Sequence, residues 1–201
     1  ADWVRRTPDP EWHDCLRAQL HALPPTVFRL LPWLLRAREE HDESLVKVVM
    51  ANAVADPDGL ALEMHDERVS WAELDELSSR VAYVLSGLGV RQGDVVALVG
   101  QSSPLYVGIT LGVARLGGTT ALINYHLEGG PLSHAVKTSG ARVAITEQEF
   151  AESLESRQDV RSQLRHLLSY RKGSLEERIA AAPPQVFPRV VVPAASDYIY
   201  I

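Results

Sequence analysis

The stretch Val95–Asn124, VVALVGQSSPLYVGITLGVARLGGTTALIN, decides the fold of this chain. It opens on an unbroken apolar run, Val95–Val99, which predicts a buried strand. Turn residues follow, and Pro104 then stands at the first helical position behind Ser103, a favoured N-cap residue. After the strand, the pattern predicts a helix over Pro104–Leu116 and a second strand over Thr119–Asn124.

The same stretch has no charged residue between Val95 and Ala114, and about 20 such residues are enough to cross a bilayer. A membrane-spanning helix is therefore an alternative to the strand and the helix. However, Gly100–Pro104 interrupts the middle of the run with a turn and a helix start, where a single spanning helix tolerates a break least. We therefore expect a buried strand, a turn and a buried helix.

The alternation of strands and helices continues after this stretch. A helix is predicted over Pro131–Thr138, a strand over Arg142–Thr146 and a further helix over Glu147–Ser156. Thr146 and Glu149 have the spacing of a capping box at the start of the last helix. Short apolar strands that alternate with helices predict an α/β fold, with a largely parallel sheet flanked by helices on both faces.

A hairpin and a helix are predicted before the deciding stretch. Leu60–Trp71, LALEMHDERVSW, alternates like two strands, with a turn at His65–Arg68. Ser70 and Glu73 have the spacing of a capping box, which predicts the start of a helix over Trp71–Leu88. The glycines expected to end this helix and the residues expected to face inward are Gly87, Gly89, Leu74, Leu77, Val81, Val84 and Leu85.

The first third of the chain has helical patterns that prolines separate, over Asp9–Leu23, Pro25–Arg38 and Glu43–Ala55. The middle pattern joins a wide apolar face to arginines, an arrangement that can lie at a membrane interface. A helix packed on a neighbouring domain is the alternative, and Pro32 inside the pattern favours it. The apolar residues are Val27, Phe28, Leu30, Leu31, Trp33, Leu34 and Leu35.

The pattern weakens beyond Gln158. A helix opened by Ser174 and Glu177 is expected, and a proline-punctuated connector with a strand candidate at Val190–Val192 follows. The last residues, Ser196–Ile201, have the β-forming composition of a strand that enters a core. Because the chain also starts with an alanine, we expect it to be a piece of a longer protein.

The composition excludes several classes of function. The chain has 201 residues, 46% of them hydrophobic, which is typical of a globular protein with a real core. A net charge of −6 without a basic patch argues against a nucleic-acid partner. Cys15 is the only cysteine, which excludes an internal disulfide and a multi-cysteine metal site and favours the cytoplasm.

Two motifs resemble reactive sites and fail at a defining position. Gly112 and Gly117 have the spacing of a phosphate-binding loop, but Gly118 stands in place of its lysine, so we expect these glycines to end a helix. Gly100–Pro104, GQSSP, lacks the second glycine of a serine hydrolase elbow. We therefore assign Ser103 a capping role.

The histidines and paired carboxylates do not form a site either. His126 and His134 come closest to a cluster, and His134 is expected to be a partly buried packing or hydrogen-bonding residue. Glu39–Glu40 and Glu176–Glu177 are expected on solvated faces. No catalytic, cofactor-binding or metal-binding residue is assigned in this chain.

Two motifs resemble those of the adenylate-forming acyl-CoA synthetases, the AMP-binding superfamily. Trp71–Leu74, WAEL, is similar to their aromatic-x-Glu-Leu helix start. Gly89–Ala97, GVRQGDVVA, is similar to the sequence of their next strand. Ala121–Ile145, ALINYHLEGGPLSHAVKTSGARVAI, is similar to the branch of fatty acid transport proteins and very-long-chain acyl-CoA synthetases. The resemblance covers about residues 45 to 201.

The resemblance implies a parent enzyme that activates a fatty acid with ATP and Mg to an acyl-adenylate and transfers the acyl group to coenzyme A. Residues 43–201 would be an incomplete N-terminal subdomain, cut before the phosphate loop, and residues 1–42 a helical extension. Tyr198–Tyr200 would be the strand that leads to the loop, although Ile201 stands where the family usually has threonine. The catalytic groups would follow in the missing C-terminal remainder, so this chain alone would be inactive.

Two alternatives remain open. The substrate could be an aryl, bile or short-chain acid in place of a long or very long fatty acid. In the other alternative, the chain is a non-catalytic α/β module that binds a membrane or a protein through Phe28–Leu35. A cytoplasmic protein with peripheral membrane contact through residues 25–38 is the expected localisation.

Overall fold

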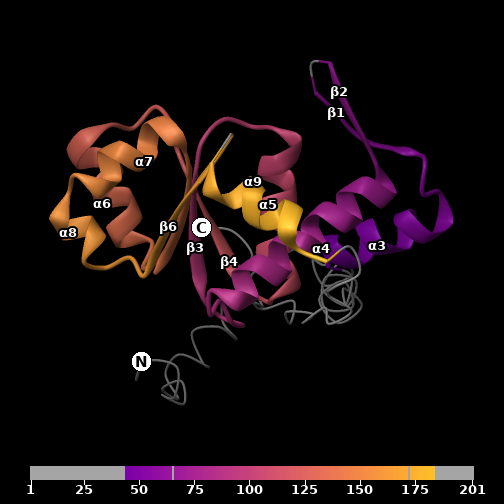
Figure 1. Cartoon of the computed structure of the whole chain (residues 1–201), viewed down its shortest axis with the longest axis horizontal. Coiled ribbons are helices and arrows are strands. Elements are labelled where there is room, and N and C mark those ends of the chain that lie inside the picture. Colours follow the sequence, from indigo (N-terminus) through magenta and orange to yellow (C-terminus); the bar gives the residue numbers. More distant parts are fainter. Residues whose placement is uncertain (1–43, 65, 172, 184–201) are drawn as a thin grey trace, which may run out of the picture. The chain divides into compact units, whose positions relative to one another are not determined.

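The computed structural model describes residues 44–64, 66–171 and 173–183 (Figure 1). The chain divides into two units after His41, and every described residue lies in the second unit. The predictions for the helices before Glu43, for Val190–Val192 and for Tyr198–Tyr200 lie outside the described residues.

A four-stranded parallel sheet forms the centre of the described unit, in the order β4-β3-β5-β6. The strands are β3 (Val95–Val99), β4 (Thr119–Ile123), β5 (Val143–Glu147) and β6 (His166–Tyr170). Val96 to Val99 are fully buried, as an apolar strand covered on both faces requires. The α/β class and the largely parallel sheet are therefore confirmed.

Helices cover both faces of this sheet. Figure 1 shows α6 (Gly129–Thr138), α7 (Gln148–Glu155) and α8 (Gln158–Arg161) on one side. On the other side lie α4 (Trp71–Gly87), α5 (Pro104–Arg115) and α9 (Ser174–Ala181). Alternate residues of β3 enter the two cores: Val96 and Leu98 face the α4–α5 side, and Ala97 and Val99 face the α6–α8 side.

A helix and a hairpin precede α4. Helix α3 (Leu45–Ala55) starts at Ser44, whose side chain accepts the Lys47 N–H, and it packs on α4 and α5. The hairpin pairs β1 (Leu60–Met64) antiparallel with β2 (Glu67–Ser70). The prediction that the turn includes Glu67 and Arg68 is wrong, because both residues pair across the ladder with Met64 and Glu63.

The start of α4 confirms the predicted capping box. Ser70 N–H donates to Glu73 Oε2 at 2.8 Å, and Glu73 N–H donates to Ser70 Oγ at 3.3 Å. The helix ends at Gly87 with Leu88 as its C-cap, and Gly89 follows with a φ of +88°, which suits a glycine. Val90 N–H then donates to Leu85 O at 3.0 Å and closes the turn. All five residues predicted to face inward lie in or against the core, Leu77 as a partly buried one.

The deciding stretch forms the predicted strand, turn, helix and strand. Ser103 caps α5, since its Oγ accepts the Tyr106 N–H at 3.1 Å. In the described part of the chain, no helix is long and apolar enough to cross a membrane.

The capping predictions for α7 and α9 are wrong. Strand β5 continues to Glu147, which pairs with Tyr170 of β6, so α7 starts one residue later and has no side-chain cap. The hydroxyl of Thr146 is buried and has no hydrogen-bond partner among the described residues. Helix α9 begins after Gly173, whose N–H donates to Glu176 Oε2 at 3.2 Å, in place of the expected Ser174–Glu177 pair.

Two further elements differ from their predictions. Helix α6 begins at Gly129 and not at Pro131. Strand β6 was not expected, because its five residues lie between Arg165 and Arg171 in a segment of mixed charge. This segment forms a strand because it pairs with β5 over Val143–Glu147.

Helices α4 and α5 approach closely because α5 presents two glycines to α4. A Cβ on Gly108 would collide with Leu77, and one on Gly112 would come within 2.7 Å of the Val81 Cβ. Gly112 lies inside α5, so the prediction that it ends the helix is wrong. Gly117, with a φ of +70°, does follow the helix end, as predicted. Arg115, which is only 2% exposed, stabilises the same contact between α4 and α5. It forms an ion pair with Asp75 and donates a hydrogen bond to Ser78 Oγ at 2.9 Å.

We predict that Gly112→Ala lowers the free energy of unfolding by about 1 to 3 kcal/mol, because the new methyl group overpacks the contact with Val81. Urea denaturation measures this change. Gly130→Ala is the matched control, since nothing lies within 4 Å of the new Cβ and the helix gains up to about 1 kcal/mol. Equal stability of the two variants would contradict the close-packing argument.

Candidate functional site

The carboxyl ends of β3 and β5 form the switch point of the sheet. Helix α5 leads from β3 to β4 on one face, and α6 leads from β4 back to β5 on the other face. The loops that leave β3 and β5 therefore diverge, and open α/β sheets bind their ligands outside such strand ends.

A cavity of about 470 Å³ opens at this edge. Gln101 of the loop after β3 borders the cavity. The other walls come from the loop after β4, with Tyr125, His126 and Glu128, and from α7, with Glu149 and Phe150. The Tyr125 and His126 rings lie 4.1 Å apart between centroids, so one wall is aromatic. Among its described lining residues there are two carboxylates and no lysine or arginine, which disfavours a phosphate in this cavity.

A buried carboxylate lies beneath the same edge. Glu147, at the end of β5, is 6% exposed. Its Oε1 accepts the Gln101 N–H at 2.6 Å and the Tyr170 O–H at 3.3 Å, and its Oε2 lies 3.5 Å from Arg171 Nη1. Burial, and then the neighbouring Glu147 carboxylate, raise the pKa of the Tyr170 hydroxyl, so Tyr170 remains a neutral donor.

Gly100 allows this arrangement. It has a φ of +155°, and a Cβ there would come within 2.8 Å of Glu147 Oε1 and collide with the Tyr170 ring and hydroxyl. Only a residue without a side chain lets the end of β3 pass this close to the ends of β5 and β6.

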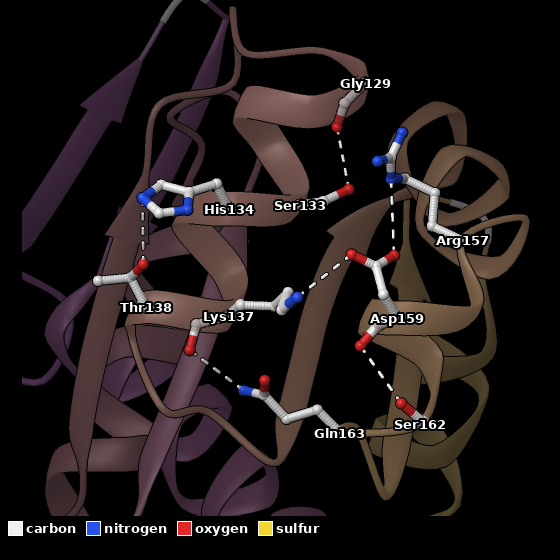
Figure 2. Close-up of polar contacts among 9 residues, drawn as sticks. All are labelled: Gly129, Ser133, His134, Lys137, Thr138, Arg157, Asp159, Ser162 and Gln163. Carbon is white, nitrogen blue, oxygen red and sulfur yellow. Dashed lines mark hydrogen bonds and ion pairs between the residues drawn. The ribbon is translucent and has the colours of Figure 1, made fainter.

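The two histidines that the sequence singled out have different positions. His126 borders the cavity, whereas His134 lies on the exposed surface of α6. The prediction that His134 is partly buried is wrong, but its hydrogen-bonding role is confirmed, because its ring nitrogen lies 3.4 Å from Thr138 Oγ1. Figure 2 draws this contact. The part of the chain that the structure describes contains no group of three or more His, Cys, Asp or Glu residues that could hold a metal.

Polar contacts join α6 to α8 behind the cavity. Lys137 Nζ lies 3.3 Å from Asp159, which also pairs with Arg157, and Gln163 donates to Lys137 O at 3.4 Å (Figure 2). Exposed pairs of this kind contribute about 1 kcal/mol or less each, so we assign them a structural role.

The model of the family described as AMP-binding enzyme matches residues 49–201. The chain belongs to the AMP-binding enzyme family. The resemblance inferred from the sequence motifs is confirmed, and the sheet with its flanking helices matches the N-terminal domain of adenylate-forming enzymes.

Curated relatives and solved structures agree with this membership. Long-chain fatty acid transport protein 1 of Rattus norvegicus is 33% identical over 144 residues, which cover 70% of this chain and 22% of that protein. The medium/long-chain-fatty-acid–CoA ligase FadD6 of Mycobacterium tuberculosis is 28% identical over 130 residues, 65% of this chain and 22% of the ligase. The chain thus spans about a fifth of the length of these relatives.

The N-terminal domain of FACL13 from Mycobacterium tuberculosis has the same arrangement in a crystal structure. It aligns with a TM-score of 0.71 at 25% identity, over 79% of this chain and 41% of that domain structure.

In this AMP-binding family member, the local sequence patterns give Gln101 and Glu147 no role at the edge of the sheet. Gln101 was considered only as part of a failed hydrolase motif, and Glu147 only as a helix start. A carboxylate at the end of a short strand pattern, after three apolar residues and Thr146, was the available signal, but its partners Gln101 and Tyr170 are 46 and 23 residues away.

We predict that Gly100→Ala lowers the free energy of unfolding by about 3 kcal/mol, because the new methyl group displaces Tyr170 and Glu147. Urea denaturation followed by tryptophan fluorescence measures it. Gly87→Ala, where nothing lies within 4 Å of the new Cβ, is the control and should change stability by less than about 1 kcal/mol. A Gly100→Ala variant as stable as the control would show that the strand ends have room to separate.

Proposed function

We propose that the chain is part of an ATP-dependent fatty acid–CoA ligase that acts on long or very long chains. The observation that carries this proposal is the match of residues 49–201 to the AMP-binding enzyme family. The substrate class is supported by the relatives, one a long-chain fatty acid transport protein and another a medium/long-chain-fatty-acid–CoA ligase.

The proposed reaction has two steps. A fatty acid carboxylate attacks the α-phosphorus of ATP, which forms the acyl-adenylate and releases pyrophosphate. The thiol of coenzyme A then attacks the acyl carbonyl, loses its proton and displaces AMP. Adenylation is needed because a carboxylate is a poor electrophile, and Mg²⁺ with backbone N–H groups offsets the phosphate charge.

The described residues contribute the scaffold of this site and not its phosphate-binding groups. The cavity at the switch point is bordered by Glu128 and Glu149, which repel phosphates. Because the described residues offer no metal cluster, we assign no Mg²⁺ ligand among them. We place the phosphate loop after Tyr198–Tyr200, in the remainder of a longer protein, and propose that residues 1–201 alone neither catalyse the reaction nor bind ATP tightly.

A thioester assay on the full-length gene product tests the enzyme proposal. We expect product that depends on both ATP and coenzyme A, with the highest kcat/KM for long acyl chains. Aryl, bile and short-chain acids are the comparison substrates, and a preference for one of them would change the substrate class while it keeps the reaction. No activity on any carboxylate would contradict the proposal.

Isothermal titration calorimetry of residues 1–201 with ATP tests the proposal that this chain alone does not bind ATP tightly. We expect no binding in the micromolar range, because the described residues that line the cavity include two carboxylates and no lysine or arginine. Micromolar affinity would show that a nucleotide site lies within this chain.

We also propose that the parent protein is cytoplasmic and contacts membranes peripherally through residues 25–38. The supporting feature is the apolar group that includes Phe28 and Leu31 beside three arginines. In liposome flotation, we expect Phe28→Glu with Leu31→Glu to reduce the bound fraction of the intact chain. Val54→Glu, at an apolar position that is 85% exposed on α3, is the control. Equal flotation of both variants would contradict the proposed membrane contact through residues 25–38.

A further inference from the structure

The Glu147 cluster joins three chain segments that leave the sheet at its ligand-binding edge. Gln101 belongs to the loop after β3, Glu147 ends β5, Tyr170 ends β6 and Arg171 follows it. The other three residues meet at the Glu147 carboxylate, so the relative placement of these three strand ends depends on a single side chain.

The position of this carboxylate is costly without its partners. Removing a carboxylate from water costs several kcal/mol unless hydrogen bonds and a cation compensate for it. Glu147 has two donors on one oxygen and a guanidinium near the other, which supplies that compensation. The Arg171 side chain is 46% exposed, so this ion pair contributes little to stability, whereas the two hydrogen bonds to Oε1 tie Glu147 to the loop after β3 and to β6.

The bond to Gln101 connects the cluster to the cavity. The donor is the Gln101 backbone N–H, at 2.6 Å, and the rest of the same residue borders the cavity at the switch point. Arg171 supports the cluster at the cost of a strained backbone, since its φ of +60° is unusual for a non-glycine residue. Three features thus meet at the loop after β3: the strained backbone of Arg171, the position of Gly100, which has no room for a side chain, and the buried carboxylate of Glu147.

We propose that Glu147 is a positioning residue: its carboxylate holds the loop after β3 so that Gln101 faces the ligand cavity. Glu147 touches no ligand itself and acts through the Gln101 backbone. The inference that the loop serves a ligand rests on the proposed ligase function, whereas the inference that Glu147 holds the loop rests on the geometry alone.

Amide hydrogen exchange of residues 1–201, measured by NMR, tests the geometric part. In the wild type, the Gln101 amide proton should resonate downfield of the other loop amides, because it donates a short, charge-assisted bond. In Glu147→Gln, which keeps the shape and removes the charge, exchange at Gln101 should accelerate by about tenfold or more. Glu155→Gln, an exposed carboxylate on α7, is the control and should leave that rate within about twofold.

Two NMR results would overturn the geometric part of the proposal. One is a Gln101 exchange rate in Glu147→Gln that equals the rate in the Glu155→Gln control. The other is a Gln101 amide resonance in the wild type without the downfield position, a measurement that needs no variant to fold.

Steady-state kinetics of the full-length protein test the ligand part. We expect Glu147→Gln to raise the KM of at least one substrate by about threefold or more and to change kcat by less than about twofold, because a displaced loop weakens binding. An unchanged KM beside accelerated exchange would leave Glu147 as a structural residue and overturn its positioning role. A protein without any ligase activity would instead contradict the proposed function, and the exchange result would still stand.

Discussion

Strand β3 needs cover on both of its faces, and the rest of the described structure follows from that requirement. Val96 to Val99 have no exposed surface, and each face of the strand meets its own hydrophobic core. One layer of helices could not satisfy both faces, so the chain must cross from one side of the sheet to the other between β4 and β5. This crossing creates the switch point, and the cavity lies where the divergent loops leave a space.

The same geometry explains why polar groups gather at the carboxyl ends of the strands. Backbone groups at the end of a buried parallel sheet lose their ladder partners at a place where water has limited access. Glu147 accepts one such N–H from the neighbouring segment, and Tyr170 and Arg171 compensate for its charge. Open α/β sheets bind their ligands outside such an edge, and a network with one carboxylate at its centre favours a single geometry there.

Local patterns predicted the elements that local interactions stabilise. The Ser70–Glu73 capping box, the Ser103 cap and the apolar run of β3 depend on neighbours within a few residues, and each was correct. The Thr146–Glu149 pattern had the right spacing and failed, because pairing between Glu147 and Tyr170 extends β5 past the expected cap. Three features depend on segments that are distant in sequence: strand β6, the internal position of Gly112 and the partners of Glu147. Local sequence patterns therefore could not predict them.

The two helical layers differ in how they are held, and this difference gives the unit an uneven local stability. Glycine contacts and the buried Arg115 join α4 and α5, so neither helix can separate from the sheet without exposing a charge and a large apolar area. On the opposite face, α8 has only four residues, and it contacts α6 through the exposed Lys137–Asp159 ion pair and the buried side chain of Val160. We therefore expect local opening to start on the α6–α8 side, which includes the α6 and α7 residues that border the cavity.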